Sequence, residues 1–182
     1  VEGADRDAIY AKIKEDPKLS IVEEDKNAAL LFDTYNEKVE TLLSIKIGTV
    51  EDNLCLSRIP GDERSKICTP QETLKNGSDI ATLVAHAFRE MAKASDIAIQ
   101  NGGGVRTDIS SGDITMGDAY KLLPFANTLV EMDMSGAEIK LVLEEAIEYA
   151  LQPDGSDGAF PYAAGLRWHV DSTRTAGNRL SE

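Results

Sequence analysis

The motif NGGGVR, which begins at Asn101 and ends at Arg106, holds the residues best suited to chemistry in this chain. The glycines Gly102, Gly103 and Gly104 let the backbone approach a ligand closely and adopt positive φ, and exposed N–H groups in such a turn can bind an anion. Arg106 adds a planar fork of donors that suits a phosphate, and the Asn101 amide can both donate and accept hydrogen bonds. The motif is not GxGxxG and no long helix follows it directly, which excludes the dinucleotide-binding pattern. The alternative is a glycine-rich turn that carries a solvated arginine.

A second candidate is the motif LPFAN, which ends at Asn127. Pro124 makes the turn rigid and could present Phe125 to solvent, where an aromatic ring can stack on a planar base. The alternative is that Phe125 belongs to the core.

The segments around both motifs show the patterns of helices and of strands. Ser78, Thr115 and Ser135 stand where helix N-caps are expected, and Glu138 completes a capping box with Ser135. We expect helices over 27–44, from Ser78 to Met91, from Thr115 to Pro124 and from Ser135 to Ala150, and strands over 45–50, 96–100, 128–134 and 166–170. This mixture predicts an α+β (mixed α/β) domain behind an N-terminal helix, with a polar, non-periodic segment before it.

The composition limits the class of partner. The 182 residues carry a net charge of −13, whereas binding to a phosphate backbone needs concentrated positive charge, so nucleic acid is excluded. No apolar run reaches the about 18 residues of a membrane span, and no signal-peptide pattern is present. His86 and His169 are the two histidines, and no cluster shows metal-ligand spacing. We therefore expect no metal site in this chain and structural or surface roles for both histidines.

Cys55 and Cys68 bracket a loop that contains Pro60 and Gly61. They could close a disulfide, which for a loop of about 15 residues is worth about 3 kcal/mol. The alternative is two unrelated buried thiols. Export to an oxidising compartment would favour the disulfide.

Three motifs together resemble a known family. NGGGVR, LPFAN and DGAFPYAAGL, in this order, are similar to segments of the C-terminal domain of the 5′-nucleotidase / UDP-sugar hydrolase family, most of all in bacterial 5′-nucleotidases and NAD nucleotidases. The resemblance covers roughly residues 27–182, and NGGGxR followed by PFxN is more specific than either motif alone. It implies a layered domain of mixed sheet and helices that binds nucleotides.

The resemblance implies a role for each matching residue. Arg106 would bind phosphate, and Asn101 would contact the substrate near the sugar or phosphate. Phe125 would stack on the base, Asn127 would hydrogen-bond to it, and Gly158 of DGAFPY would line the base pocket.

The family also has upstream arginines that clamp the phosphate, and Arg58 and Arg64 are the candidates for this role. Their spacing to the following glycine departs from the family pattern, because CTPQETLKNGS resembles an insertion. The alternative for each is a surface arginine. With Arg106 they would form a local cationic pocket on an acidic chain.

The resemblance further implies a larger protein. In this family an N-terminal metallophosphoesterase domain holds two divalent metal ions, such as zinc or manganese, and its Asp-x-His and Gly-Asn-His motifs do not occur in this sequence. We expect residues 1–26 to be a polar linker or the end of that domain, residues 27–48 to be an inter-domain linker helix, and residues 49–182 to be an incomplete substrate-binding domain. The family's GGDG(Y/F) segment, which carries a second stacking aromatic, does not occur before Glu182.

The resulting hypothesis is the substrate-binding domain of a 5′-nucleotidase-type hydrolase that acts on nucleoside 5′-phosphates, with nucleotide sugars and NAD as further candidate substrates. Its partners would be AMP or a related nucleotide and the N-terminal domain of the same protein, in the periplasm, at the cell surface or secreted. The chain alone would be inactive. The alternatives are a non-enzymatic module that binds nucleotides or sugar phosphates, and an interaction fragment that binds no small molecule.

Overall fold

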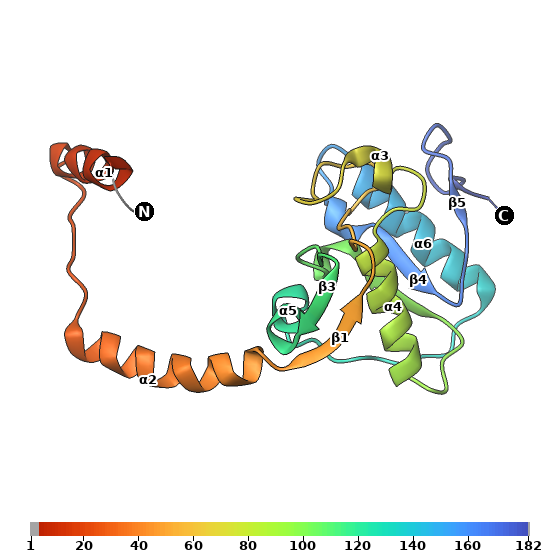
Figure 1. The fold of residues 1–182 in the computed structure, drawn as a ribbon. Helices are drawn as coiled ribbons and strands as arrows, with labels where there is room; N and C mark the ends of the chain where they lie inside the picture. Colours follow the sequence, from red (N-terminus) through yellow and green to blue (C-terminus); the bar gives the residue numbers. More distant parts are fainter. Residues whose placement is uncertain (1–3, 182) are drawn as a thin grey trace. The chain divides into compact units, whose positions relative to one another are not determined.

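The computed structural model describes residues 4–181, and the chain divides into two compact units between Leu42 and Leu43. The first unit contains helix α1 (Ala4–Glu15) and nearly all of helix α2 (Lys26–Leu43) (Figure 1). Helix α1 was not expected from the sequence, because the segment lacks an apolar stripe. The helix instead contains three alanines and two lysines, which are residue types of high helix propensity.

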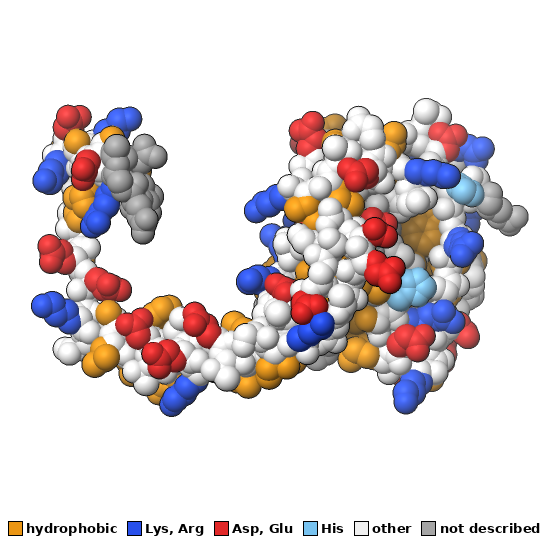
Figure 2. Space-filling model, viewed as in Figure 1, with side chains coloured by type: hydrophobic (Ala, Val, Ile, Leu, Met, Phe, Trp, Pro, Cys, Tyr) orange, Lys and Arg blue, Asp and Glu red, His pale blue; other side chains and the backbone are white. Residues whose placement is uncertain are grey.

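Helix α2 confirms the helix expected over 27–44. It begins beside Asp25, whose Oδ1 accepts hydrogen bonds from the backbone N–H groups of Asn27 and Ala28, both at 2.9 Å. Figure 2 shows hydrophobic side chains exposed along α2, which contains no buried residue. These exposed side chains are Leu30, Leu31, Phe32, Tyr35, Val39 and Leu42. No helix in the described part of the chain is long and apolar enough to cross a membrane.

The strands of the second unit form antiparallel pairs (Figure 1). The pairs are β1 (Lys46–Val50) with β3 (Gly112–Thr115), β2 (Ala98–Asn101) with β4 (Pro161–Ala164), and β5 (His169–Val170) with β6 (Leu180–Ser181). β1 and β2 confirm the strands expected over 45–50 and 96–100. Asn101 lies opposite Pro161, so the beginning of NGGGVR lies beside the motif DGAFPYAAGL.

Three helices of the second unit begin at N-caps that the sequence predicts, and the other helical segments were not predicted. The helices are α3 (Pro70–Thr73), α4 (Asp79–Met91), α5 (Met116–Leu122) and α6 (Gly136–Leu151), together with the 3-10 helices η1 (Gly102–Gly104) and η2 (Asp157–Ala159). Ser78, Thr115 and Ser135 each accept a hydrogen bond from a backbone N–H in the first turn of the following helix. Thr115 and Ser135 form capping boxes with Asp118 and Glu138. The three expected N-caps are therefore confirmed.

The core of the second unit joins α4, α6 and the β2–β4 pair. Ile80 of α4, Ile147 of α6 and Tyr162 of β4 are buried in one cluster with Val105, which follows η1. Helices packed on small antiparallel sheets make a mixed α+β fold, as predicted. Val105 is the apolar side chain of NGGGVR and is only 1% exposed, so its burial anchors the motif in the core.

Other strand expectations differ from the structure. Residues 128–134 form neither a strand nor a helix, and Val130 and Met132 are 74% and 69% exposed. A segment with a strand-like sequence becomes a strand only if a neighbouring strand supplies hydrogen bonds. None of the described strands pairs with residues 128–134. The strand expected over 166–170 is reduced to β5, and β4 was not predicted.

Candidate functional site

The glycines of NGGGVR bring three segments together. A Cβ atom on Gly103 would lie 3.0 Å from the Cα of Gly158, and one on Gly102 would lie 3.3 Å from the Cα of Arg58. The backbone of η1 therefore packs directly against η2 and against the loop that carries Arg58. We expected these glycines to let the backbone approach a ligand and to adopt positive φ. None of the three has a positive φ, and the close approach seen here is to other segments of the chain. Their role is to leave room.

Asn101 fixes this junction. Its Nδ2 donates a hydrogen bond to the carbonyl oxygen of Gly158 at 3.1 Å, and the N–H of Gly102 donates to the carbonyl oxygen of Phe160 at 2.8 Å. In the structure, the asparagine for which we expected a substrate contact holds η1 against η2. Gly158 lies within this junction.

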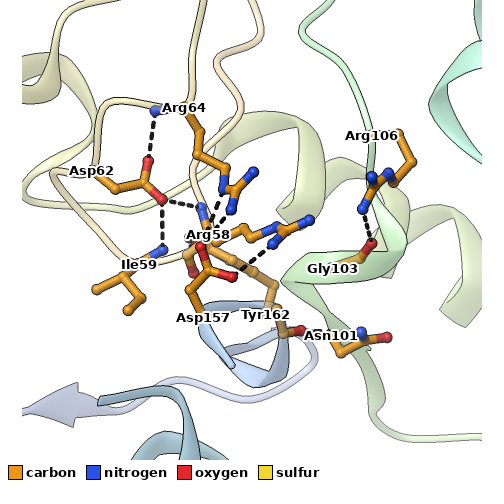
Figure 3. Close-up of polar contacts among 10 residues, drawn as sticks. Arg58, Ile59, Asp62, Arg64, Asn101, Gly103, Arg106, Asp157 and Tyr162 are labelled. Atoms are coloured by element: carbon orange, nitrogen blue, oxygen red, sulfur yellow. Dashed lines mark hydrogen bonds and ion pairs between the residues drawn. The ribbon is translucent and has the colours of Figure 1, made fainter. Parts of the chain in front are cut away.

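Arg58 and Arg64 meet at one carboxylate, that of Asp157 (Figure 3). Arg58 Nη1 lies 2.6 Å from Asp157 Oδ1, and Arg64 reaches Oδ2 with Nη2 at 2.7 Å and Nε at 3.2 Å. The Arg58 side chain is 14% exposed, whereas those of Arg64 and Asp157 are 42% and 35% exposed. The two candidate phosphate-binding arginines are therefore neighbours, although they come from a loop with an unusual spacing.

The pKa of Asp157 is held below its ordinary value of 3.8. Partial burial alone would raise this pKa, but the hydrogen bonds from Arg64 and Arg58 and their positive charges outweigh it. Asp157 is consequently an anion at neutral pH.

The loop that carries these arginines is fixed through its backbone. Asp62 Oδ2 accepts hydrogen bonds from the N–H groups of Arg58 and Ile59 at 2.9 and 3.1 Å, and Asp62 Oδ1 accepts from that of Arg64 at 3.2 Å (Figure 3). One carboxylate thus sets the turn between the two arginines.

Two further ties hold the ends of this loop. The structure joins Cys55 and Cys68 in a disulfide with a Cα–Cα distance of 5.8 Å. Asp108 Oδ1 accepts hydrogen bonds from the Leu56 N–H at 2.6 Å and from Ser65 Oγ at 2.7 Å. Because Asp108 follows NGGGVR closely, it ties the loop to the segment that contains the third arginine.

Arg106 lies beside both η1 and LPFAN. Its Nη1 donates to the carbonyl oxygen of Gly103 at 3.1 Å, and its guanidinium carbon lies 5.5 Å from the centre of the Phe125 ring. This distance is within the range of a cation–π contact. Phe125 is 54% exposed, as expected if the ring is presented for stacking rather than packed in the core. Ala126, at a φ of 51°, makes the turn that follows it.

A hollow of about 530 Å³ is lined by Phe125, Asn127, Gly104 and Gln100 among others. The expected base-binding residues Phe125 and Asn127 therefore share one surface. Gly158, expected in the same pocket, lies instead against Gly103, in the junction of η1 with η2. Its proximity to the base stays a prediction.

The carboxylates Asp62, Asp108 and Asp157 were missed by the sequence analysis. Asp157 had a usable signal, since it is the residue before Gly158 in a motif already singled out. Nothing in the spacing of the other two carboxylates marks them, because their partners are backbone N–H groups and a serine that only the folded loop brings near. Among the described residues, no group of three or more histidine, cysteine or acidic side chains could hold a metal ion. His86 and His169 are both exposed.

Comparisons with known proteins identify the family of this chain. The family model for the 5′-nucleotidase C-terminal domain matches residues 46–182. The NAD 5′-nucleotidase of Haemophilus influenzae is 35% identical over 179 residues, which are 98% of this chain and 29% of that protein. A probable 5′-nucleotidase of Treponema pallidum is 34% identical and covers 93% of this chain and 28% of its own length.

Solved structures show the same relation. The NAD nucleotidase of Haemophilus influenzae superimposes with a TM-score of 0.66 at 33% identity over 100% of this chain and 31% of its own. The 5′-nucleotidase precursor of Thermus thermophilus gives 0.63 at 32% identity over 87% and 29%. The chain thus spans about 30% of the length of these relatives. The resemblance and the fold class inferred from the sequence are confirmed, and the chain belongs to the family of 5′-nucleotidase C-terminal domains.

Proposed function

We propose that this domain binds the phosphate of a nucleotide with Arg58, Arg64 and Arg106 and stacks the base on Phe125. One observation carries the proposal. The three arginines come from two distant segments and border the junction of η1 with η2 on a chain whose net charge is −13. A cationic cluster on an acidic protein is a local feature that suits a small anion.

The donors of the cluster suit a phosphate. Arg64 already places two N–H groups on one carboxylate oxygen, and Arg58 places a third on the other oxygen. Phosphate oxygens can accept hydrogen bonds from the same guanidinium groups. A phosphate carries more negative charge than a carboxylate and has one more oxygen that can accept. Arg106, which follows β2 and η1, would supply the third guanidinium group.

Arg106 also connects the phosphate to the base. Its guanidinium donates a hydrogen bond to Gly103 and lies near the ring of Phe125, so a ligand that contacts both Arg106 and Phe125 would carry an anion next to an aromatic ring. Stacking on an exposed aromatic is worth about 1–3 kcal/mol per base. Asn127 lines the same hollow as Phe125, and its amide can donate and accept hydrogen bonds at the edge of the base.

The hydrolytic step is assigned to another part of the protein. The relatives are named as nucleotidases and are more than three times as long as this chain. We propose that a metallophosphoesterase domain precedes residue 27, that it holds two divalent metal ions which activate the attacking water, and that residues 27–48 link the two. The arginines then bind and orient the phosphate. A disulfide persists in oxidising compartments, which supports a periplasmic, cell-surface or secreted location.

Titration calorimetry tests the binding. AMP should bind the chain, adenosine should bind more weakly because it lacks the phosphate, and Arg106→Ala should weaken AMP far more than adenosine. Phe125→Leu should weaken both ligands about equally. Arg167→Ala removes an exposed arginine outside this site and is the matched control. Equal loss of AMP binding in Arg106→Ala and Arg167→Ala would mean only a general charge effect, and the proposed site would be wrong.

A further inference from the structure

The Asp157 carboxylate occupies the two guanidinium groups in the way that a phosphate would. One of its oxygens contacts Arg58 at 2.6 Å, and the other contacts Arg64 at 2.7 Å (Figure 3). Donors that face this carboxylate are directed away from any other anion. The proposed phosphate clamp therefore contains an anion of its own.

We propose that Asp157 competes with the ligand phosphate for Arg58 and Arg64, and so sets the affinity of the site. This inference rests on the proposed function, since it needs a phosphate at these arginines. It assigns to Asp157 a role in tuning affinity rather than in catalysis. In the unliganded domain the carboxylate keeps both guanidinium groups paired, and the ligand takes them over.

The exposure of the three side chains allows this exchange. Asp157 and Arg64 are 35% and 42% exposed, and ion pairs with such access to water are weak because water and salt compete for the charges. The carboxylate can therefore turn away at small cost. Arg58 is only 14% exposed, so it needs an anionic partner at all times. A phosphate dianion meets that need better than a single carboxylate.

Asp157 is well placed to act in this way. It is the first residue of η2, and its neighbour Gly158 is held by the hydrogen bond from Asn101. The backbone at Asp157 is thus fixed while its side chain remains partly in solvent. The other nearby carboxylate, Asp62, is engaged by backbone N–H groups. Asp157 is accordingly the carboxylate in the described residues that neutralises these guanidinium groups.

The test uses inorganic phosphate, which has no base and so reports on the arginines alone. Asp157→Asn should bind phosphate about 5- to 30-fold more tightly than the unchanged chain, as expected for removal of a carboxylate that competes for both arginines. Asp154→Asn is the matched control, because it removes the same charge from an exposed position of the same loop. Its phosphate affinity should stay within about twofold.

Thermal unfolding supplies a second readout. Without phosphate, Asp157→Asn should melt at a lower temperature than the unchanged chain, because Arg58 loses its anion. Added phosphate should raise the melting temperature of this variant by more than it raises that of the unchanged chain. Asp157→Ser replaces the variant if the asparagine form does not fold.

The outcomes separate the two proposals. If Arg58→Ala does not weaken phosphate binding by the otherwise unchanged chain, the phosphate site itself is wrong. If Arg58→Ala weakens binding but Asp157→Asn binds phosphate no more tightly than Asp154→Asn does, the site stands and the competition is overturned. In that case Asp157 would be a positioning residue for the arginines.

Discussion

The disulfide between Cys55 and Cys68 closes the loop that carries Arg58 and Arg64, and its removal has a calculable effect on stability. The two cysteines are 13 residues apart, and a loop of about 15 residues corresponds to about 3 kcal/mol of chain entropy removed from the unfolded state. We expect the Cys55→Ala, Cys68→Ala double variant to lose about 3 kcal/mol of unfolding free energy, or about 10 °C in melting temperature.

Denaturant unfolding followed by the fluorescence of Trp168 measures this change, because Trp168 is the one tryptophan of the chain and packs against the core of the second unit. Reducing the unchanged chain should give the same loss without any substitution. The reductant should leave the double variant unaffected, which is the control. A loss below about 1 kcal/mol in both experiments would refute the reasoning, and the Asp108 hydrogen bonds would then be sufficient to hold the loop.

Three further predictions follow from the packing and the charges. Ile147→Ala, at a fully buried position of α6, should cost about 2–5 kcal/mol in denaturant unfolding, and a cost below 1 kcal/mol would contradict the described core. Gly103→Ala should force η1 away from Gly158 and weaken phosphate binding, whereas Gly136→Ala, whose added Cβ meets nothing within 4 Å, should leave it unchanged. Because the pKa of Asp157 is lowered on folding, its stabilising effect is present above its ordinary value of 3.8 and is lost as the pH falls below it. The difference in melting temperature between the unchanged chain and Asp157→Asn should therefore shrink between pH 5 and about pH 2, and a constant difference would argue against the ion pairs.

The sequence predicts those features of the fold that depend on local chemistry. Ser78, Thr115 and Ser135 cap helices because their oxygens need only a backbone N–H within the next turn. Residues 128–134 have the alternation of a strand, but the partner that would make them one is a property of the whole fold. In helix α1 the element is present without the pattern, because this helix forms without an apolar face.

The same distinction applies to the site. Arg106 and Phe125 were found from their motifs, and the structure brings them within 5.5 Å of each other. The partner of Arg58 and Arg64 was not found, because Asp157 is far away in the sequence and the contact depends on how η1 packs against η2. Long-range pairing of this kind follows from tertiary packing, which the spacing of residues does not encode.

A crystal structure of the chain with AMP bound would test the central claim most directly. We predict that phosphate oxygens lie within hydrogen-bonding distance of Arg58, Arg64 and Arg106, and that the adenine ring stacks on Phe125. Asp157 should have turned away from at least one of its two arginines. AMP bound with its phosphate away from all three arginines, or with its base remote from Phe125, would contradict the account.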